Sequence, residues 1–213
     1  MRFYHTLSMH VLIAFFILTI FALPALATDY YVSPDGTASW PNCTSENNPC
    51  PASSTETDFL NAVAGDTVIF LDGTYDAGTQ PGAYRAIVWN PSNSGTSDNK
   101  ITFKAKNSRQ ATINGTVDPN VMQGNRVNVI GARLRNHIVW EGFKVTANGG
   151  DHLATVRLDG TDGTTSYCTV KDCEIVGASH SLGGAGNFEG LRIEEADHIT
   201  IEDCYVHGFI ETS

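Results

Sequence analysis

The sequence predicts an all-β protein folded as a right-handed parallel β-helix, a solenoid in which each coil stacks on the one before. Three segments that begin at residues 138, 168 and 199 align without gaps, at spacings of 30 and 31 residues. A period in this range is typical of stacked supersecondary units. Apolar and polar residues alternate within each segment, as on a strand. The alternation shifts by one at Gly142, Asp172 and Asp203, which predicts two short strands joined by a bend.

Stacking the segments places apolar residues in four inward columns: Ile138, Cys168 and Ile199; Trp140, Val170 and Ile201; Phe143, Cys173 and Cys204; and Val145, Ile175 and Val206. In the outward columns Glu141, Lys171 and Glu202 alternate in sign, and Lys144 lies beside Glu174. Strands lie about 4.8 Å apart, so opposite charges in one column are favourable. The three cysteines are therefore expected in the core, with a bridge between the last two as the alternative.

A second set of strands is expected between the repeats, at 155–158 and 190–193. Gly- and Asp-rich stretches such as 159–163 and 183–187 are typical of turns or projecting loops. Each coil therefore carries several strands and a loop of variable length. No long helical period occurs in this region, which excludes a solenoid of helices.

Residues 1–27 are predicted to be a signal peptide. Arg2 supplies positive charge, an apolar run covers 11–21, and Ala25-Leu26-Ala27 is a small-x-small cleavage pattern. The alternative is an uncleaved anchor, but the run is short of the roughly 20 apolar residues that span a bilayer. We therefore expect a secreted or extracytoplasmic protein, in the periplasm or at the cell surface, without a membrane segment after cleavage.

Residues 28–65 are predicted to form a cap and residues 66–213 the coils. Cys43 and Cys50 bracket a polar loop, and an exported chain can oxidise them to a disulfide. A short amphipathic helix is expected over 57–64, with Phe59, Leu60 and Val63 on one face. No closing helix follows the last repeat, although solenoids are capped at both ends, so we expect further coils beyond Ser213.

The charge balance restricts the partners. Without Arg2, 12 basic residues face 23 acidic ones, which disfavours a nucleic-acid partner. An anionic polysaccharide would need a local basic patch or a bound cation. We expect a monomer.

Two regions resemble a known superfamily. The cap motif at 30–36 and the strand and turn at 65–75 resemble the first coil of pectate-lyase-like β-helices. The segments 98–105 and 111–115 are similar to the next coil in the alginate lyase and chondroitinase B group. The resemblance implies β-elimination of uronate-containing polysaccharides, with calcium held by Asn and Glu and with Lys and Arg as base and acid. None of these roles maps onto a residue of this chain. The alternative is a non-catalytic surface, adhesive or glycan-binding β-helix.

The candidate substrate-binding residues are Arg157, Glu189, Arg192, Glu194 and His198. If the two arginines stack on neighbouring coils, an anion must lie between them. A sugar carboxylate could fill this position, and so could Asp159 or Glu194, in which case these are ordinary outward residues paired with one another.

An acidic group could hold calcium through oxygen ligands. It comprises Glu194, Glu195, Asp197, Glu202 and Asp203. The alternative is that these carboxylates pair with neighbouring cations. His137 and His198 occupy equivalent positions before a strand and are expected to be turn residues.

Overall fold

We describe the fold from a computed structural model of the chain. The structure describes residues 26–78, 87–116, 128–148, 154–177, 179–181, 189–208 and 210–212. The predicted signal peptide lies almost wholly outside these residues and stays a prediction. No helix among the described residues is long and apolar enough to cross a membrane.

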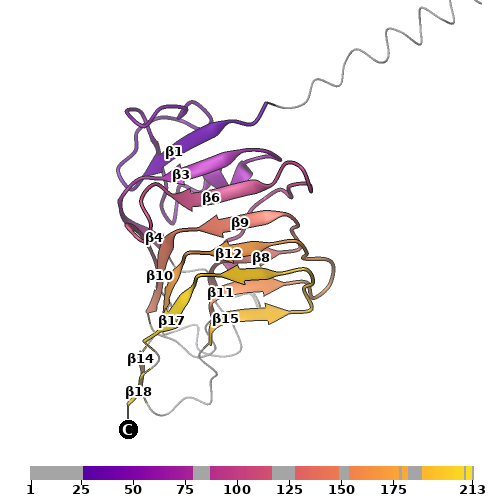
Figure 1. The fold of residues 1–213 in the computed structure, drawn as a ribbon. Coiled ribbons are helices and arrows are strands. Elements are labelled where there is room, and N and C mark those ends of the chain that lie inside the picture. The colour runs from indigo at the N-terminus through magenta and orange to yellow at the C-terminus, as the bar shows by residue number, and fades with distance from the viewer. Residues whose placement is uncertain are drawn as a thin grey trace, which may run out of the picture.

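Seven strands form sheet A, in the order β16-β12-β9-β6-β3-β1-β2. Their bounds are β1 Asp29–Ser33, β2 Cys50–Pro51, β3 Thr67–Phe70, β6 Ile101–Ala105, β9 Ile138–Glu141, β12 Thr169–Lys171 and β16 Thr200–Glu202. Every pairing in this sheet is parallel. Figure 1 shows the strands stacked from the indigo β1 downward.

Two further parallel sheets complete each coil. Sheet B has the order β17-β13-β10-β7-β4, and sheet C the order β15-β11-β8-β5. The strands of sheet B are β4 Gly73–Gly78, β7 Ala111–Thr116, β10 Phe143–Asn148, β13 Glu174–Val176 and β17 Tyr205–His207; those of sheet C are β5 Ile87–Trp89, β8 Asn128–Arg133, β11 Ala154–Asp159 and β15 Glu189–Glu194. A separate parallel pair joins β14 Ser179–Ser181 to β18 Ile210–Thr212.

The chain passes from sheet A to B to C and returns to A one coil further along. This path confirms the predicted parallel β-helix, and the predicted register is confirmed too. Val170 pairs with Trp140 and Ile201, as the inward column requires. In the outward column Lys171 pairs with Glu141, and its Nζ lies 3.1 Å from the glutamate Oε2.

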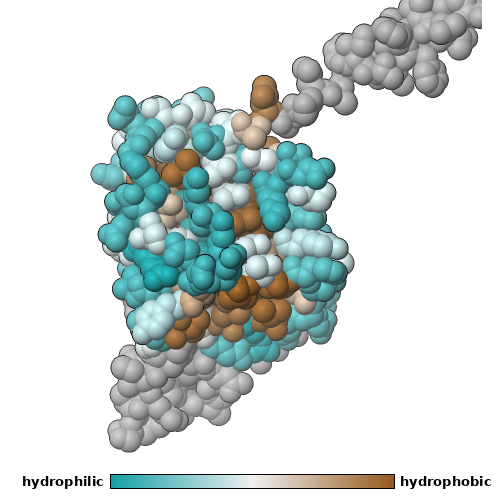
Figure 2. Space-filling view, viewed as in Figure 1, coloured by the Kyte–Doolittle hydropathy of each residue, from teal (hydrophilic) through white to brown (hydrophobic). Residues whose placement is uncertain are grey.

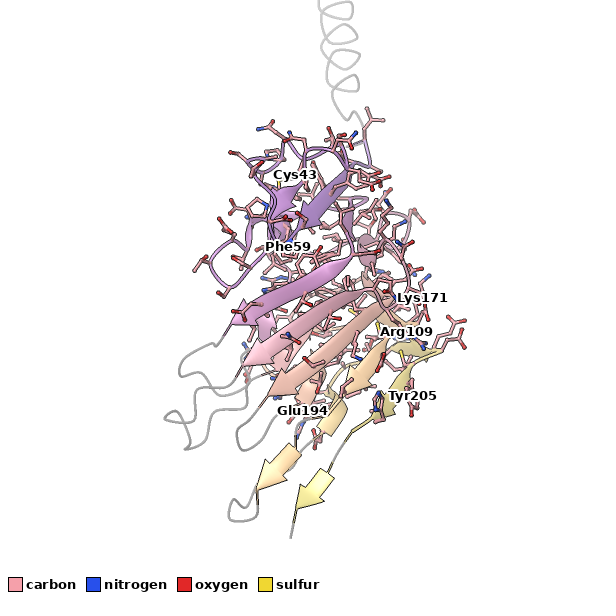
Figure 3. All side chains as sticks on the ribbon, turned by 90° about the vertical axis from the view of Figure 1, so that its left-hand side faces the viewer. Cys43, Phe59, Arg109, Lys171, Glu194 and Tyr205 are labelled. Atoms are coloured by element: carbon pink, nitrogen blue, oxygen red, sulfur yellow. A yellow bond between two sulfur atoms is a disulfide. The ribbon has the colours of Figure 1, made fainter. Side chains whose placement is uncertain are left out.

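The bend between sheets A and B is held by left-handed backbone and by one arginine. Gly142, Asp172 and Asp203 have φ values of 74°, 51° and 50°. Arg109, one coil earlier, donates from Nη2 to Asp172 Oδ1 at 3.0 Å and to the Asp203 carbonyl at 3.2 Å. It thereby ties three coils together, and Figure 3 shows it beside Lys171 on this side of the solenoid.

Aromatic side chains fill the interior near the cap. Phe59 makes edge contacts with Phe70 and Trp89, at ring-centroid distances of 5.4 and 4.9 Å. Phe103 stacks on Trp140 at 4.5 Å, which continues the column from one coil to the next. The expected core positions of the cysteines are confirmed for Cys168 and Cys173, which are fully buried, whereas Cys204 is partly exposed.

The cap contains the predicted Cys43–Cys50 disulfide. The predicted helix over 57–64 is wrong in extent, because the structure has only a 3-10 turn, η1, at Asp58–Asn61. Val63 is consequently 48% exposed instead of lying on a buried face. The Asp66 carboxylate accepts hydrogen bonds from the Val63 and Thr28 amides, at 2.9 and 3.2 Å, and turns the chain toward β3.

The last described coil leaves apolar side chains partly uncovered. Ile193, Ile201 and Val206 are 45%, 39% and 45% exposed, although their columns point inward in the preceding coils. Figure 2 shows hydrophobic surface toward this lower end of the described residues. The expectation of coils beyond Ser213 stays a prediction.

Candidate functional site

Four of the five predicted site residues lie together on sheet C, and the fifth lies elsewhere. Arg157 on β11 pairs in register with Arg192 on β15, so the predicted stacking of the two arginines occurs. Glu189 and Glu194 begin and end β15. Alternation along these strands turns the arginines outward, because Val156 and Leu158 fill the core.

Carboxylates separate the two guanidinium groups. Arg157 Nη2 lies 3.0 Å from Asp159 Oδ2 and also donates to Glu194 Oε2. Arg192 Nε donates to the same Glu194 oxygen at 3.0 Å, and its Nη1 lies 3.1 Å from Glu189 Oε2. The repulsion expected between stacked arginines is therefore offset by a shared carboxylate. Figure 3 labels Glu194, which lies away from Arg109 and Lys171.

The cluster extends one coil toward the cap. Arg133 on β8 lies in register with Asp159, and its Nε is 3.5 Å from Asp159 Oδ2. Its Nη2 is 3.3 Å from Asp162 Oδ2 in the following turn. The sequence analysis missed Arg133; extending the strand columns back by one coil would have placed it opposite Asp159.

Burial divides this charged cluster into an inner and an outer part. The side chains of Arg157 and Asp159 are both 0% exposed. Those of Arg192 and Glu189 are 23% and 33% exposed. Burial lowers the pKa of the Arg192 guanidinium, but the hydrogen bond to Glu194 and the charges of Glu189 and Glu194 outweigh it, so its pKa is raised. Arg192 is thus a permanent cation that solvent can reach.

His198 lies outside this cluster, in the turn between β15 and β16. Its ring stacks on Tyr167 at 4.4 Å, and Tyr167 stacks on His137 at 4.9 Å. Asp197 Oδ1 lies 2.8 Å from His198 Nδ1. Both histidines have positive φ, so their expected role as turn residues is confirmed.

Three of the five acidic residues predicted to hold calcium have other partners. Within the described part of the chain, no three His, Cys, Asp or Glu side chains gather so that they could hold a metal ion. In the predicted acidic group, Glu194 contacts two arginines, Asp197 contacts His198, and Glu202 lies in register with Lys171.

Charged pairs also cover the outer face of sheet B. Glu174 Oε1 lies 3.1 Å from Lys144 Nζ and 3.0 Å from His207 Nε2. Burial raises the pKa of Glu174, but the hydrogen bonds and charges of these two partners outweigh it, so its pKa lies below the usual value.

Comparisons with known proteins found no matching family or curated protein, but they found similar solved structures. No protein-family model matches the sequence, and no curated protein matches it. The structure is similar to a rhamnogalacturonan lyase, with 17% identity and a TM-score of 0.47 over 84% of this chain and 56% of that one. It is also similar to the pectate lyase Pel9A, with 18% identity and a TM-score of 0.49 over 84% of this chain and 48% of that one. The chain thus spans about half the length of each, and the nearness to the alginate lyase group stays a prediction.

Proposed function

We propose that this chain forms part of a secreted, carbohydrate-directed β-helix that binds a uronate-containing polysaccharide on the outer face of sheet C. One observation carries the proposal: two arginines in register on neighbouring coils contact the same carboxylate. Paired guanidinium groups of this kind recognise planar carboxylates well. The buried Arg157 holds the position of Glu194, while Arg192 faces solvent.

In this proposal a sugar carboxylate replaces Glu189 at Arg192. Glu189 is the most exposed of the carboxylates that contact the two arginines, so its displacement disturbs the cluster least. Arg192 Nη1 contacts both Glu189 oxygens, at 3.2 and 3.1 Å, and a uronate offers the same two acceptors. The exchange supplies the local positive site that an acidic protein needs for an anionic polymer.

A polysaccharide lyase is the catalytic form of this proposal. Beta-elimination needs a cation beside the uronate carboxylate and a base that removes the neighbouring proton. Arg192 supplies the first group. The ion pairs described for this cluster join arginines to carboxylates, which supports carboxylate binding more strongly than proton abstraction.

The experiment compares Arg192→Met with Lys104→Met, which removes the same charge from sheet A. Binding of polygalacturonate, alginate, chondroitin and neutral dextran is measured by titration calorimetry. We expect Arg192→Met to weaken binding of a uronate polymer about tenfold, the effect of one charge-assisted contact. Lys104→Met should leave binding unchanged. Equal affinity for dextran, or no effect of Arg192→Met, would refute the proposed site.

Catalysis is tested on the same samples by following absorbance from unsaturated sugar ends, with and without calcium. New absorbance that Arg192→Met reduces supports the lyase. Binding without new absorbance supports the glycan-binding module.

A further inference from the structure

A groove beside the start of the sheet A strands is not used by the proposed function. It has a volume of about 460 Å³ and lies where each coil enters sheet A. Its lining includes one column of basic and aromatic residues, Lys100, His137, Tyr167 and His198, and one of hydroxyls, Thr169 and Thr200. No member of the charged cluster on sheet C lines it.

The groove is periodic because the coils are. Ile101 pairs with Ile138, so the preceding residues, Lys100 and His137, are neighbours across the coils. Thr169 pairs directly with Thr200. Side chains at equivalent positions therefore recur along the solenoid axis at the strand spacing of about 4.8 Å. A repeating groove matches a repeating ligand.

The stacking of the rings decides what they offer a ligand. Tyr167 lies between two imidazoles, with interplanar angles of 5° and 19°, so both of its faces are covered. Its edge and hydroxyl remain for the groove, and the residue is 46% exposed. Its φ of 57° is unusual for a bulky side chain. The ring stack explains why an aromatic residue occupies this strained position. A phenylalanine would stack equally well, so the stack does not explain the Tyr167 hydroxyl.

Lys100 gives the groove its charge. Among the described residues no carboxylate forms an ion pair with Lys100, whereas Lys144 and Lys171 each pair with a glutamate. Asp197, the residue before His198, contacts the His198 ring. The groove therefore combines a cation with hydroxyl and imidazole groups that both donate and accept hydrogen bonds.

We propose that this groove is a second saccharide-binding site, which takes an acidic sugar chain along the solenoid axis. A carboxylate or sulfate of the chain lies at Lys100. Sugar hydroxyls bind Thr169, Thr200 and the edge of Tyr167. The site is independent of Arg192 and goes beyond the proposed function on sheet C.

The test uses the full chain and short probes: oligogalacturonate for the carboxylate, dextran sulfate for the sulfate, and a neutral cello-oligosaccharide. Titration calorimetry compares Lys100→Met and Tyr167→Phe with the control Lys104→Met, all in an Arg192→Met background that removes the other site. We expect Lys100→Met to weaken binding of an acidic probe about tenfold, the effect of one charge-assisted contact. Tyr167→Phe keeps the ring stack and should weaken it several-fold, and Lys104→Met should not change it.

Ring signals of His137 and His198 in NMR spectra locate the ligand, and they should shift as an acidic probe is added. The inference is overturned if no probe shifts these signals, if Lys100→Met binds like Lys104→Met, or if the neutral probe binds equally well. Loss of binding in Arg192→Met alone, with unshifted histidine signals, would support only the site on sheet C.

Discussion

Replacement of Arg157 by methionine tests whether the charged cluster on sheet C supports the fold. The Arg157 guanidinium is fully buried and lies 3.0 Å from the fully buried Asp159 carboxylate. Methionine retains most of the apolar stem but removes the cation. Asp159 then keeps the longer ionic contact of 3.5 Å to Arg133 and the hydrogen bond of 2.9 Å from the Thr161 amide.

The expected loss is large because a buried carboxylate loses its main ionic partner. Breaking a buried ion pair from one side costs about 3–5 kcal/mol. For a chain of this size each kcal/mol lowers Tm by roughly 2–4 °C, so Arg157→Met should lower Tm by about 10 °C. Replacing Asp159 by asparagine in the same chain removes the unpaired charge and should recover about 1–3 kcal/mol of the loss.

Urea unfolding followed by circular dichroism measures these free energies. Arg192→Met is the matched control, because Arg192 lies in the same column with its side chain 23% exposed. A partly exposed ion pair contributes about 1 kcal/mol or less. Equal loss in Arg157→Met and Arg192→Met, or no recovery in the double variant, would refute a role for burial of the pair.

Three further predictions concern the disulfide of the cap, the loss of stability at acid pH and the reactivity of the free thiols. Replacing Cys43 and Cys50 by serine should cost about 2–3 kcal/mol by urea unfolding, from the loop entropy of a separation of 7 residues. The folded pKa of Glu174 is lowered, although burial opposes the shift, so its contribution is complete above the unfolded value of about 4.3 and disappears as the pH falls through the folded value. The free energy of unfolding of Glu174→Gln should therefore fall less than that of the wild type between about pH 5 and 3. An equal fall in the two proteins would contradict this. The hydrogen bond from the neighbouring buried thiol lowers the pKa of Cys204 to about 6, whereas burial raises that of Cys168 to about 11. Iodoacetamide at neutral pH should label Cys204 first by peptide mapping, and equal labelling of Cys168 would contradict the assignment.

The stacking of the coils was predictable because alternation on a strand has a period of two residues. Once Trp140, Val170 and Ile201 are placed in one column, every other side chain in those strands is assigned to a face. The structure confirms this register. The bends were predictable for a related reason, since the phase shift occurs at the residues that adopt left-handed backbone.

The structure differs from two sequence-based expectations, the extent of the helix and the grouping of His198 with Arg192. The spacing of Phe59, Leu60 and Val63 fits a helix, but the helical turn ends at Ala62, where ψ is 142°. The Asp66 carboxylate then accepts hydrogen bonds from the Val63 and Thr28 amides. His198 was grouped with Arg192 because only six positions separate them. The chain leaves sheet C between these two residues. Arg192 contacts Glu189 and Glu194, whereas His198 stacks on Tyr167.

Arg157 and Arg192 differ in burial, and the sequence pattern does not show this difference. Both are outward arginines in one column, and both contact Glu194. Arg157 has a strand on either side, and on the β8 side its neighbour is Gly131, where a Cβ atom would lie 1.8 Å from the Arg157 carbonyl oxygen. Arg192 has a neighbouring strand on the β11 side within sheet C. Among the described residues Arg157 is enclosed between two strands and is fully buried, whereas Arg192 lies beside one strand and is partly exposed. The proposed function assigns the ligand to Arg192, and the burial of Arg157 assigns that residue to the fold.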